Sequence, residues 1–137
     1  MSAVLEATLP GGGEHVLYID DDDVMALMAE GLLGRAGYRV TALRDPAEAI
    51  ARVRDGPWNY DVVVTDFNMP GLSGLDVARA VAAARADLPV IVTSGLVTEA
   101  LRDGARNAGA RAVLQKERTL EELASMIRSV LAGGDHH

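Results

Sequence analysis

The sequence predicts a doubly wound sheet of five parallel strands with helices on both faces, and three observations predict it. Five short apolar runs alternate with longer amphipathic stretches along the chain. The run at residues 61–65 is apolar on both faces, as in parallel strands that helices cover from either side. Strands that alternate with helices are joined by right-handed crossovers, which place helices on both faces of one sheet.

The first half of the chain is expected to form two strands and two helices. The apolar strand at residues 15–19 ends abruptly at four aspartates. The helix after it ends at Gly37. Its apolar residues recur at helical spacing: Val24, Leu27, Met28, Leu32 and Leu33. A short strand is expected at residues 38–43. Asp45-Pro46-Ala47-Glu48 then predicts a helix start, with an N-cap, a proline in the first turn and a glutamate three residues on, and this helix runs to about Arg54.

The second half is expected to form three strands and three helices. The strand at residues 61–65 leads through a turn-rich segment to a helix at about residues 74–85. The fourth strand, at residues 89–93, precedes a helix at about residues 98–108 that Gly109 closes. The fifth strand is residues 111–115. Thr119-Leu120-Glu121-Glu122 predicts a capping box for the last helix, which ends at Gly133.

The length and composition predict one folded domain. The chain has 137 residues, and we expect a flexible lead-in at residues 1–14, the domain at residues 15–132 and a disordered tail at residues 133–137. A net charge of −7 disfavours nucleic acid and anionic membranes as partners. Neither a signal peptide nor a bilayer-spanning stretch is visible, and with no cysteine the expected location is the cytoplasm.

Polar side chains follow four of the five predicted strands. Asp20 and Asp21 follow the first strand, Asp66 the third, Ser94 the fourth and Lys116 the fifth. In open α/β sheets ligands bind beyond the carboxyl ends of the strands. If the strand order is 2-1-3-4-5, as in flavodoxin-like sheets, these side chains gather at one edge with Asp66 between the acidic pair and the Ser/Lys pair.

These residue types suit phosphoryl transfer at a metal site. Crowded carboxylates take up protons unless a cation lies among them, and oxygen ligands with open positions suit Mg²⁺. We expect Asp20, Asp21, Asp66 and the backbone carbonyl of Asn68 to bind it. A carboxylate is a competent nucleophile toward phosphorus, and Lys116 would neutralise charge on the transferring oxygens.

Simpler interpretations exist for each residue. Four successive aspartates exceed what helix capping needs, so the first two are expected to bind metal, whereas Asp22 and Asp23 cap the helix or lie outside the metal ligands. Asp66 in isolation would be a turn residue and Lys116 a surface lysine. Thr93 is an alternative to Ser94 as the hydroxyl that contacts a phosphoryl group.

In this order, the residues resemble the receiver domains of two-component signalling. The resemblance lies in residues 16–22 (VLYIDDD), 61–71 (DVVVTDFNMPG), 89–95 (PVIVTSG) and Lys116. It covers residues 15–132. It implies that Asp66 accepts a phosphoryl group, with Mg²⁺, from a histidine kinase or a histidine phosphotransfer domain. It also implies self-catalysed phosphorylation and slow dephosphorylation rather than enzymatic turnover.

The sequence departs from the family pattern at two positions. Glu117 stands where the family usually has a proline, and Val113 stands where it usually has Phe or Tyr. The aromatic rotation that accompanies activation in many members therefore cannot occur at that residue. Activation is expected to be concentrated in the loop at residues 94–98.

Other functions stay open at the level of sequence. A flavin-binding module would need a glycine- and hydroxyl-rich loop where the four aspartates stand. A phosphohydrolase would need a general acid near Asp66, and a degenerate receiver would serve only for protein contacts. The chain is expected to be a monomer or weak dimer, either a stand-alone regulator or the C-terminal receiver of a hybrid sensor histidine kinase.

Overall fold

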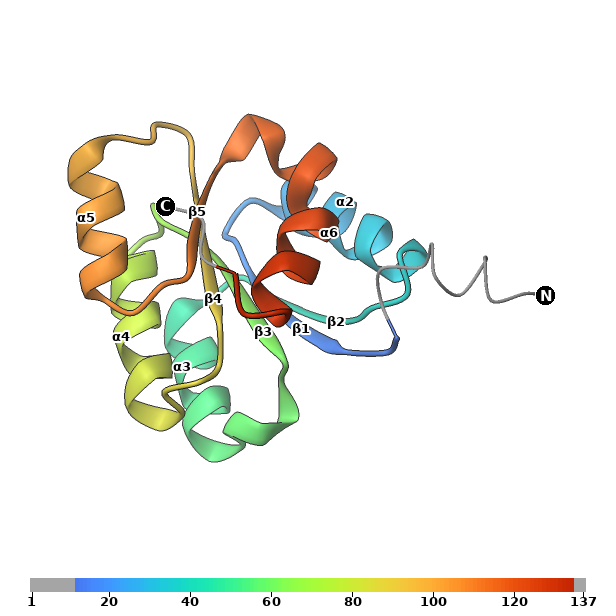
Figure 1. Ribbon diagram of the computed structural model, residues 1–137, viewed down its shortest axis with the longest axis horizontal. Coiled ribbons are helices and arrows are strands. Elements are labelled where there is room, and N and C mark those ends of the chain that lie inside the picture. The colour runs from blue at the N-terminus through green and yellow to red at the C-terminus, as the bar shows by residue number, and fades with distance from the viewer. Residues whose placement is uncertain (1–11, 135–137) are drawn as a thin grey trace.

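The computed structural model describes residues 12–134 and confirms the predicted sheet (Figure 1). All strand pairs are parallel, in the order β2-β1-β3-β4-β5. The strands are β1 (His15–Ile19), β2 (Arg39–Leu43), β3 (Val62–Asp66), β4 (Val90–Ser94) and β5 (Ala112–Gln115). Residues 1–11 of the expected lead-in and residues 135–137 of the expected tail lie outside the described residues.

Within the described residues, five α-helices and two short 3-10 helices lie between the strands or follow the last one. They are α2 (Asp23–Arg35), α3 (Pro46–Asp55), η1 (Pro57–Asn59), α4 (Gly74–Ala84), α5 (Glu99–Asn107), η2 (Lys116–Arg118) and α6 (Thr119–Leu131). Within residues 12–134, no helix is both long enough and apolar enough to cross a membrane.

The sheet separates two apolar cores. Helices α2 and α6 cover one face, and α3, α4 and α5 cover the other (Figure 1). Successive strand residues point to opposite faces, so Val16 and Tyr18 pack with α2 and α6 whereas Leu17 and Ile19 pack on the other side. Every residue of β3 and β4 is buried, as expected for central strands covered on both faces.

Two of the predicted helix starts have the expected caps. Asp22 accepts the backbone N–H groups of Val24 and Met25 at the start of α2, and Asp45 accepts that of Ala47 at the start of α3. A capping box that was not predicted begins α4, where Ser73 and Asp76 bond reciprocally.

The capping box predicted at the last helix is wrong. Thr119 is the first residue of α6 and is fully buried, and no side chain caps this helix. The physical reason is that η2 continues directly into α6, so the backbone at Thr119 is already helical. Its hydroxyl instead donates to the backbone carbonyl of Gln115 at 3.5 Å.

Strand register brings the ends of the central strands to the same level. Ile19 lies opposite Thr65, so Asp20 comes level with Asp66. On the other side Asp66 lies opposite Thr93. The predicted polar residues therefore share the carboxyl edge of the sheet.

The opposite, amino edge of the sheet is closed by polar and aromatic contacts around η1. The Arg85 guanidinium lies 4.0 Å from the ring centroid of Trp58. It also donates to the backbone carbonyls of Pro57 at 3.3 Å and Tyr60 at 3.0 Å. The His15 and Tyr60 rings lie 5.0 Å apart between centroids. These contacts fix the entry into β3 at the end away from Asp66.

Gly74 lets helix α4 begin against the end of β3. Its backbone N–H donates to the Phe67 carbonyl at 2.9 Å. A Cβ at this position would lie 2.5 Å from the Asp66 carbonyl oxygen and 3.0 Å from the Phe67 Cα. Those contacts are with backbone rather than with flexible side chains, so only glycine fits without moving the segment that carries Asp66.

We therefore expect Gly74→Ala to lower the free energy of unfolding by roughly 1–3 kcal/mol, the usual cost of overpacking. Urea denaturation would measure it. Gly34→Ala in α2 is the matched control, because beyond the neighbouring backbone of its own helix no atom lies within 4 Å of the added methyl group. There alanine should stabilise the helix by up to about 1 kcal/mol. Equal effects at the two positions would contradict the close approach at Gly74.

Candidate functional site

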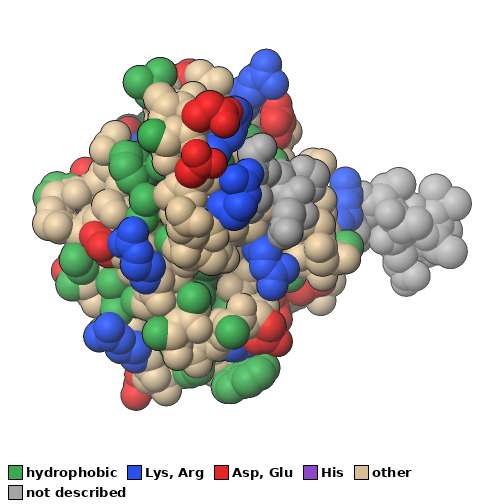
Figure 2. Space-filling view, turned by 60° about the vertical axis from the view of Figure 1, so that its left-hand side comes forward, with side chains coloured by type: hydrophobic (Ala, Val, Ile, Leu, Met, Phe, Trp, Pro, Cys, Tyr) green, Lys and Arg blue, Asp and Glu red, His purple; other side chains and the backbone are tan. Residues whose placement is uncertain are grey.

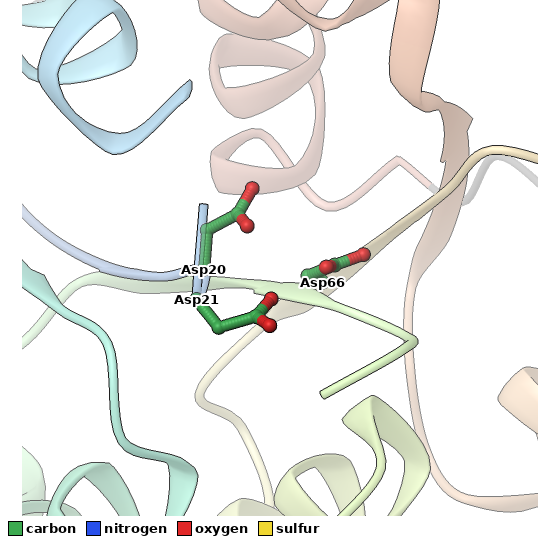
Figure 3. Close-up of side chains that lie close together, drawn as sticks. All are labelled: Asp20, Asp21 and Asp66. Carbon is green, nitrogen blue, oxygen red and sulfur yellow. The ribbon is translucent and has the colours of Figure 1, made fainter. Parts of the chain in front are cut away.

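Three carboxylates meet at the carboxyl edge of the sheet (Figure 3). Asp20 and Asp21 follow β1, and Asp66 ends β3. One oxygen from each lies within 4.8 Å of the others. Asp20 is 0% exposed and Asp66 4%, whereas Asp21 is exposed. Two negative charges are therefore buried, and the third faces solvent beside them.

Lys116 joins the two buried carboxylates. Its Nζ donates to Asp20 Oδ1 at 3.2 Å and to Asp66 Oδ2 at 3.1 Å. Burial alone would lower the pKa of Lys116, but its bonds to Asp66 and its attraction to both carboxylates outweigh this and raise it. The ammonium group therefore stays charged at neutral pH.

Burial raises the pKa values of both Asp20 and Asp66 above the usual carboxyl range. Repulsion from Asp66 adds to the rise at Asp20, and repulsion from Asp21 adds to the rise at Asp66. Lys116 and a backbone N–H at each carboxylate oppose these effects without cancelling them. The three carboxylates outnumber the single ammonium by two, so the cluster attracts a divalent cation and otherwise binds protons more readily than isolated carboxylates.

The donor set fits a magnesium ion. Asp20 Oδ2 is buried, and no atom within residues 12–134 serves it as a hydrogen-bond partner. A buried acceptor in this state is costly unless a cation or a donor reaches it. All three candidate ligands are oxygens, and the exposed side at Asp21 leaves room for the waters that Mg²⁺ retains. Asn68 lies beside the cluster, because its backbone acts on the Asp66 carboxylate and opposes the rise of that group's pKa.

Ser94 is held in a turn rather than free at the cluster. It is 2% exposed, and its hydroxyl donates to the Leu96 carbonyl at 3.0 Å and accepts the Leu96 N–H at 3.3 Å. It lines a cavity of about 360 Å³ between the loops after β3 and β4. The other lining residues are Phe67, Asn68, Leu75, Leu96, Thr98, Ala100 and Leu101. Thr93, the alternative hydroxyl, is also buried and lies in register with Asp66.

The remaining aspartates take the places expected for them. Asp22 caps α2, and Asp23 pairs with Arg44 on the surface. The sequence interpretation missed Tyr18, which is buried in β1 two residues before Asp20, on the sheet face covered by α2 and α6. The sequence does contain a feature that could have indicated its importance: Tyr18 carries a hydroxyl within an otherwise aliphatic run, two positions before the first aspartate.

The profile of one protein family matches residues 16–128, and its description is "Response regulator receiver domain". Response regulator MprA of Mycobacterium leprae (strain TN) is 36% identical over 118 residues, which are 85% of this chain and 50% of that protein. Transcriptional regulatory protein PrrA of Mycobacterium tuberculosis is also 36% identical over 118 residues, covering 85% of this chain and 49% of that protein. The chain spans about half the length of these relatives.

Solved structures share the fold. The response regulator receiver domain protein from Clostridium thermocellum has a TM-score of 0.81 and 27% identity, covering 88% of this chain and 95% of that chain. The receiver domain of the histidine kinase CKI1 from Arabidopsis thaliana, complexed with Mg²⁺, has a TM-score of 0.80 and 24% identity, covering 90% and 95%. At 24% identity, the similarity to the CKI1 receiver domain supports the shared fold and nothing further.

Magnesium should stabilise the folded protein through this cluster. At ten times its dissociation constant, Mg²⁺ would add about 1.4 kcal/mol to the free energy of unfolding, and a thermal melt would rise by a few degrees. Because the folded-state pKa values of Asp20 and Asp66 are raised, protons compete with the metal, so the rise should shrink as the pH falls from 7.5 toward 5.

The variant Asp21→Asn should lose most of this rise. The control Asp23→Asn should keep it, because Asp23 lies outside the cluster and pairs with Arg44. Melts that respond equally to Mg²⁺ in these two variants would contradict the assignment of the site.

Proposed function

Because this chain belongs to the family of response regulator receiver domains, we propose that it is a signalling domain in which Asp66 accepts a phosphoryl group from a phosphohistidine donor. The observation that carries the proposal is the position of Asp66. Its carboxylate lies close to the carboxylates of Asp20 and Asp21, with one oxygen of each within 4.8 Å of the others, and it accepts from the Lys116 ammonium at 3.1 Å. The proposed nucleophile thus lies beside both a cation-binding cluster and a fixed positive charge.

The proposed transfer leaves the donor histidine intact. An Asp66 carboxylate oxygen forms a bond to phosphorus while the phosphorus–nitrogen bond of phosphohistidine breaks. The imidazole nitrogen keeps that electron pair and takes up a proton. Lys116 would offset negative charge on the phosphoryl oxygens, which is the main requirement of phosphoryl transfer. Later, water attacks phosphorus, inorganic phosphate leaves, and the Asp66 carboxylate is restored. This is self-catalysed modification and its slow reversal, not enzymatic turnover.

We propose that Mg²⁺ is held by Asp20, Asp21, Asp66 and the backbone carbonyl of Asn68. The buried, unpartnered Asp20 Oδ2 supports a cation at this edge. When bound, the ion would neutralise charge on the transferring oxygens. This chain's own carboxylates carry the assignment; the magnesium-bound CKI1 receiver contributes only the fold.

The surface beside the cluster supports a protein donor. Helix α2 begins at Asp23, and it presents three exposed apolar side chains: Val24 at 64%, Leu27 at 71% and Met28 at 48%. Such side chains side by side on a helix are typical of protein interfaces. We propose that a histidine kinase or a histidine phosphotransfer domain docks here and presents its phosphohistidine to Asp66.

Other partner classes receive less support from the surface. Figure 2 shows acidic and basic side chains interspersed over the visible face, rather than a basic patch. With a net charge of −7, we propose that the domain does not bind nucleic acid directly. The absence of cysteine fits action in the cytoplasm, as a monomer or weak dimer. Its place in a hybrid sensor histidine kinase or a shorter regulator is part of the same proposal.

The switch is proposed to work through Ser94. In the unphosphorylated state its hydroxyl is engaged twice by the Leu96 backbone. A phosphoryl group on Asp66 offers a stronger, charge-assisted partner. Turning toward it would release Leu96, whose side chain is 74% exposed beside the cavity that both residues line. Val113 has no ring to rotate, so the change would stay in the loop after β4.

A small phosphodonor with Mg²⁺ should add one phosphoryl group to the protein, detected by intact mass. Asp66→Asn should abolish the addition, because the amide is a poor nucleophile. The control Asp87→Asn, at an exposed residue paired with Arg85, should label as the wild type does. Labelling of Asp66→Asn to the wild-type extent would refute the assignment of Asp66, and failure of the wild type to label would favour a receiver that serves only for protein contacts.

Beryllofluoride, a phosphoryl mimic, should shift backbone NMR signals around Asp20, Asp66 and residues 94–101. Signals of Val113 and of α6 should change little. Ser94→Ala should reduce the shifts at residues 95–98 while leaving those at Asp20 in place, since only the hydroxyl's new bond is lost. Unchanged NMR signals in the loop after β4, together with large shifts at Val113 and residues 119–131, would overturn this mechanism of switching.

A further inference from the structure

Tyr18 is a buried tyrosine whose hydroxyl lacks a regular hydrogen bond. It is 1% exposed and packs on the sheet face covered by α2 and α6. Across the part of the chain that the structure describes, no atom forms a regular hydrogen bond with its hydroxyl. The neighbouring positions of β1 are Val16, Leu17 and Ile19. Buried tyrosine hydroxyls usually have a partner, so a tyrosine within this aliphatic strand needs an explanation.

Asp20 offers an explanation, because its Oδ2 oxygen is a buried hydrogen-bond acceptor that lacks a donor. Tyr18 and Asp20 lie two residues apart and project from the same face of the chain. Asp20 Oδ1 already accepts from Lys116 and from the Asp22 N–H, whereas Oδ2 is buried without a partner. The Tyr18 hydroxyl and the Asp20 carboxylate therefore lie close enough to interact, and neither the hydroxyl nor Oδ2 has another partner in the described chain.

A hydrogen bond from Tyr18 would not use up the acceptor positions of the Asp20 carboxylate. A protonated phenol has one proton to donate, and an ionised carboxylate offers about four acceptor positions over its two oxygens. Asp20 Oδ2 can therefore accept from Tyr18 and still bind a cation.

We propose that Tyr18 is a positioning residue for the metal site: its hydroxyl donates to Asp20 Oδ2 and holds that carboxylate facing Asp21 and Asp66. The inference rests on the proposed magnesium site. Carboxylate ligands of metals are themselves commonly fixed by hydrogen bonds, and loss of such a partner typically weakens metal affinity by about 10–100-fold. Without the hydroxyl, the Asp20 carboxylate would be oriented only by Lys116 and the Asp22 backbone.

The test compares two variants that each remove one tyrosine hydroxyl. Tyr18→Phe keeps the ring and its packing. Tyr60→Phe is the matched control, because Tyr60 is also buried but lies at the amino edge of the sheet, against His15. Mg²⁺ affinity is measured by NMR titration of the backbone signals of residues 20–22 and 66–68. Thermal melts of the metal-free proteins measure stability separately.

The expected result is about tenfold weaker Mg²⁺ binding in Tyr18→Phe, with wild-type affinity in Tyr60→Phe. Equal affinity in Tyr18→Phe and the wild type would overturn the positioning role while leaving the magnesium site intact. Equal weakening in both variants would also overturn it, because the loss would then follow from general destabilisation. Failure of the wild type itself to bind Mg²⁺ would refute the proposed site and this inference with it.

Discussion

The contact of Lys116 with two buried carboxylates links the first, third and fifth strands of the sheet. Lys116 follows β5, yet its Nζ lies 3.2 Å from Asp20 after β1 and 3.1 Å from Asp66 in β3. Removing one partner from such a buried group leaves an unpaired charge, which typically costs about 3–5 kcal/mol. The sheet order, with β1 and β3 side by side at the centre, is what brings these residues within reach of each other.

That constraint divides the molecule into a rigid part and an adjustable part. The central strands are buried on both faces and aligned in register, so the backbones that carry Asp20 and Asp66 are firmly held. Gly74 adds a helix start against the end of β3. The loop after β4, in contrast, is held at Ser94 by two bonds of a single hydroxyl and exposes Leu96. A local change of charge at Asp66 would therefore act on the loop and not on the sheet.

The sequence was sufficient for the fold because hydrophobic periodicity and strand-end residues agreed along the whole chain. It also anticipated which carboxylates would meet, since parallel strands bring their carboxyl ends to one edge. It failed where side-chain geometry decides. A Thr-x-x-Glu pattern predicted a capping box at Thr119, but the preceding 3-10 helix had already set the helical backbone there. The unsatisfied hydroxyl of Tyr18 and the two bonds of Ser94 depend on contacts that no periodicity encodes.

The contact between Trp58 and Arg85 has a practical consequence for spectroscopy. Trp58 is the only tryptophan of the chain, and it precedes β3 whereas Asp66 ends that strand. A strand of this length separates the two by roughly 17 Å. The indole is 74% exposed and lies against a guanidinium group held by backbone carbonyls. Its fluorescence will therefore report loss of the folded state but stay nearly silent to ions or phosphoryl groups arriving at the carboxylates.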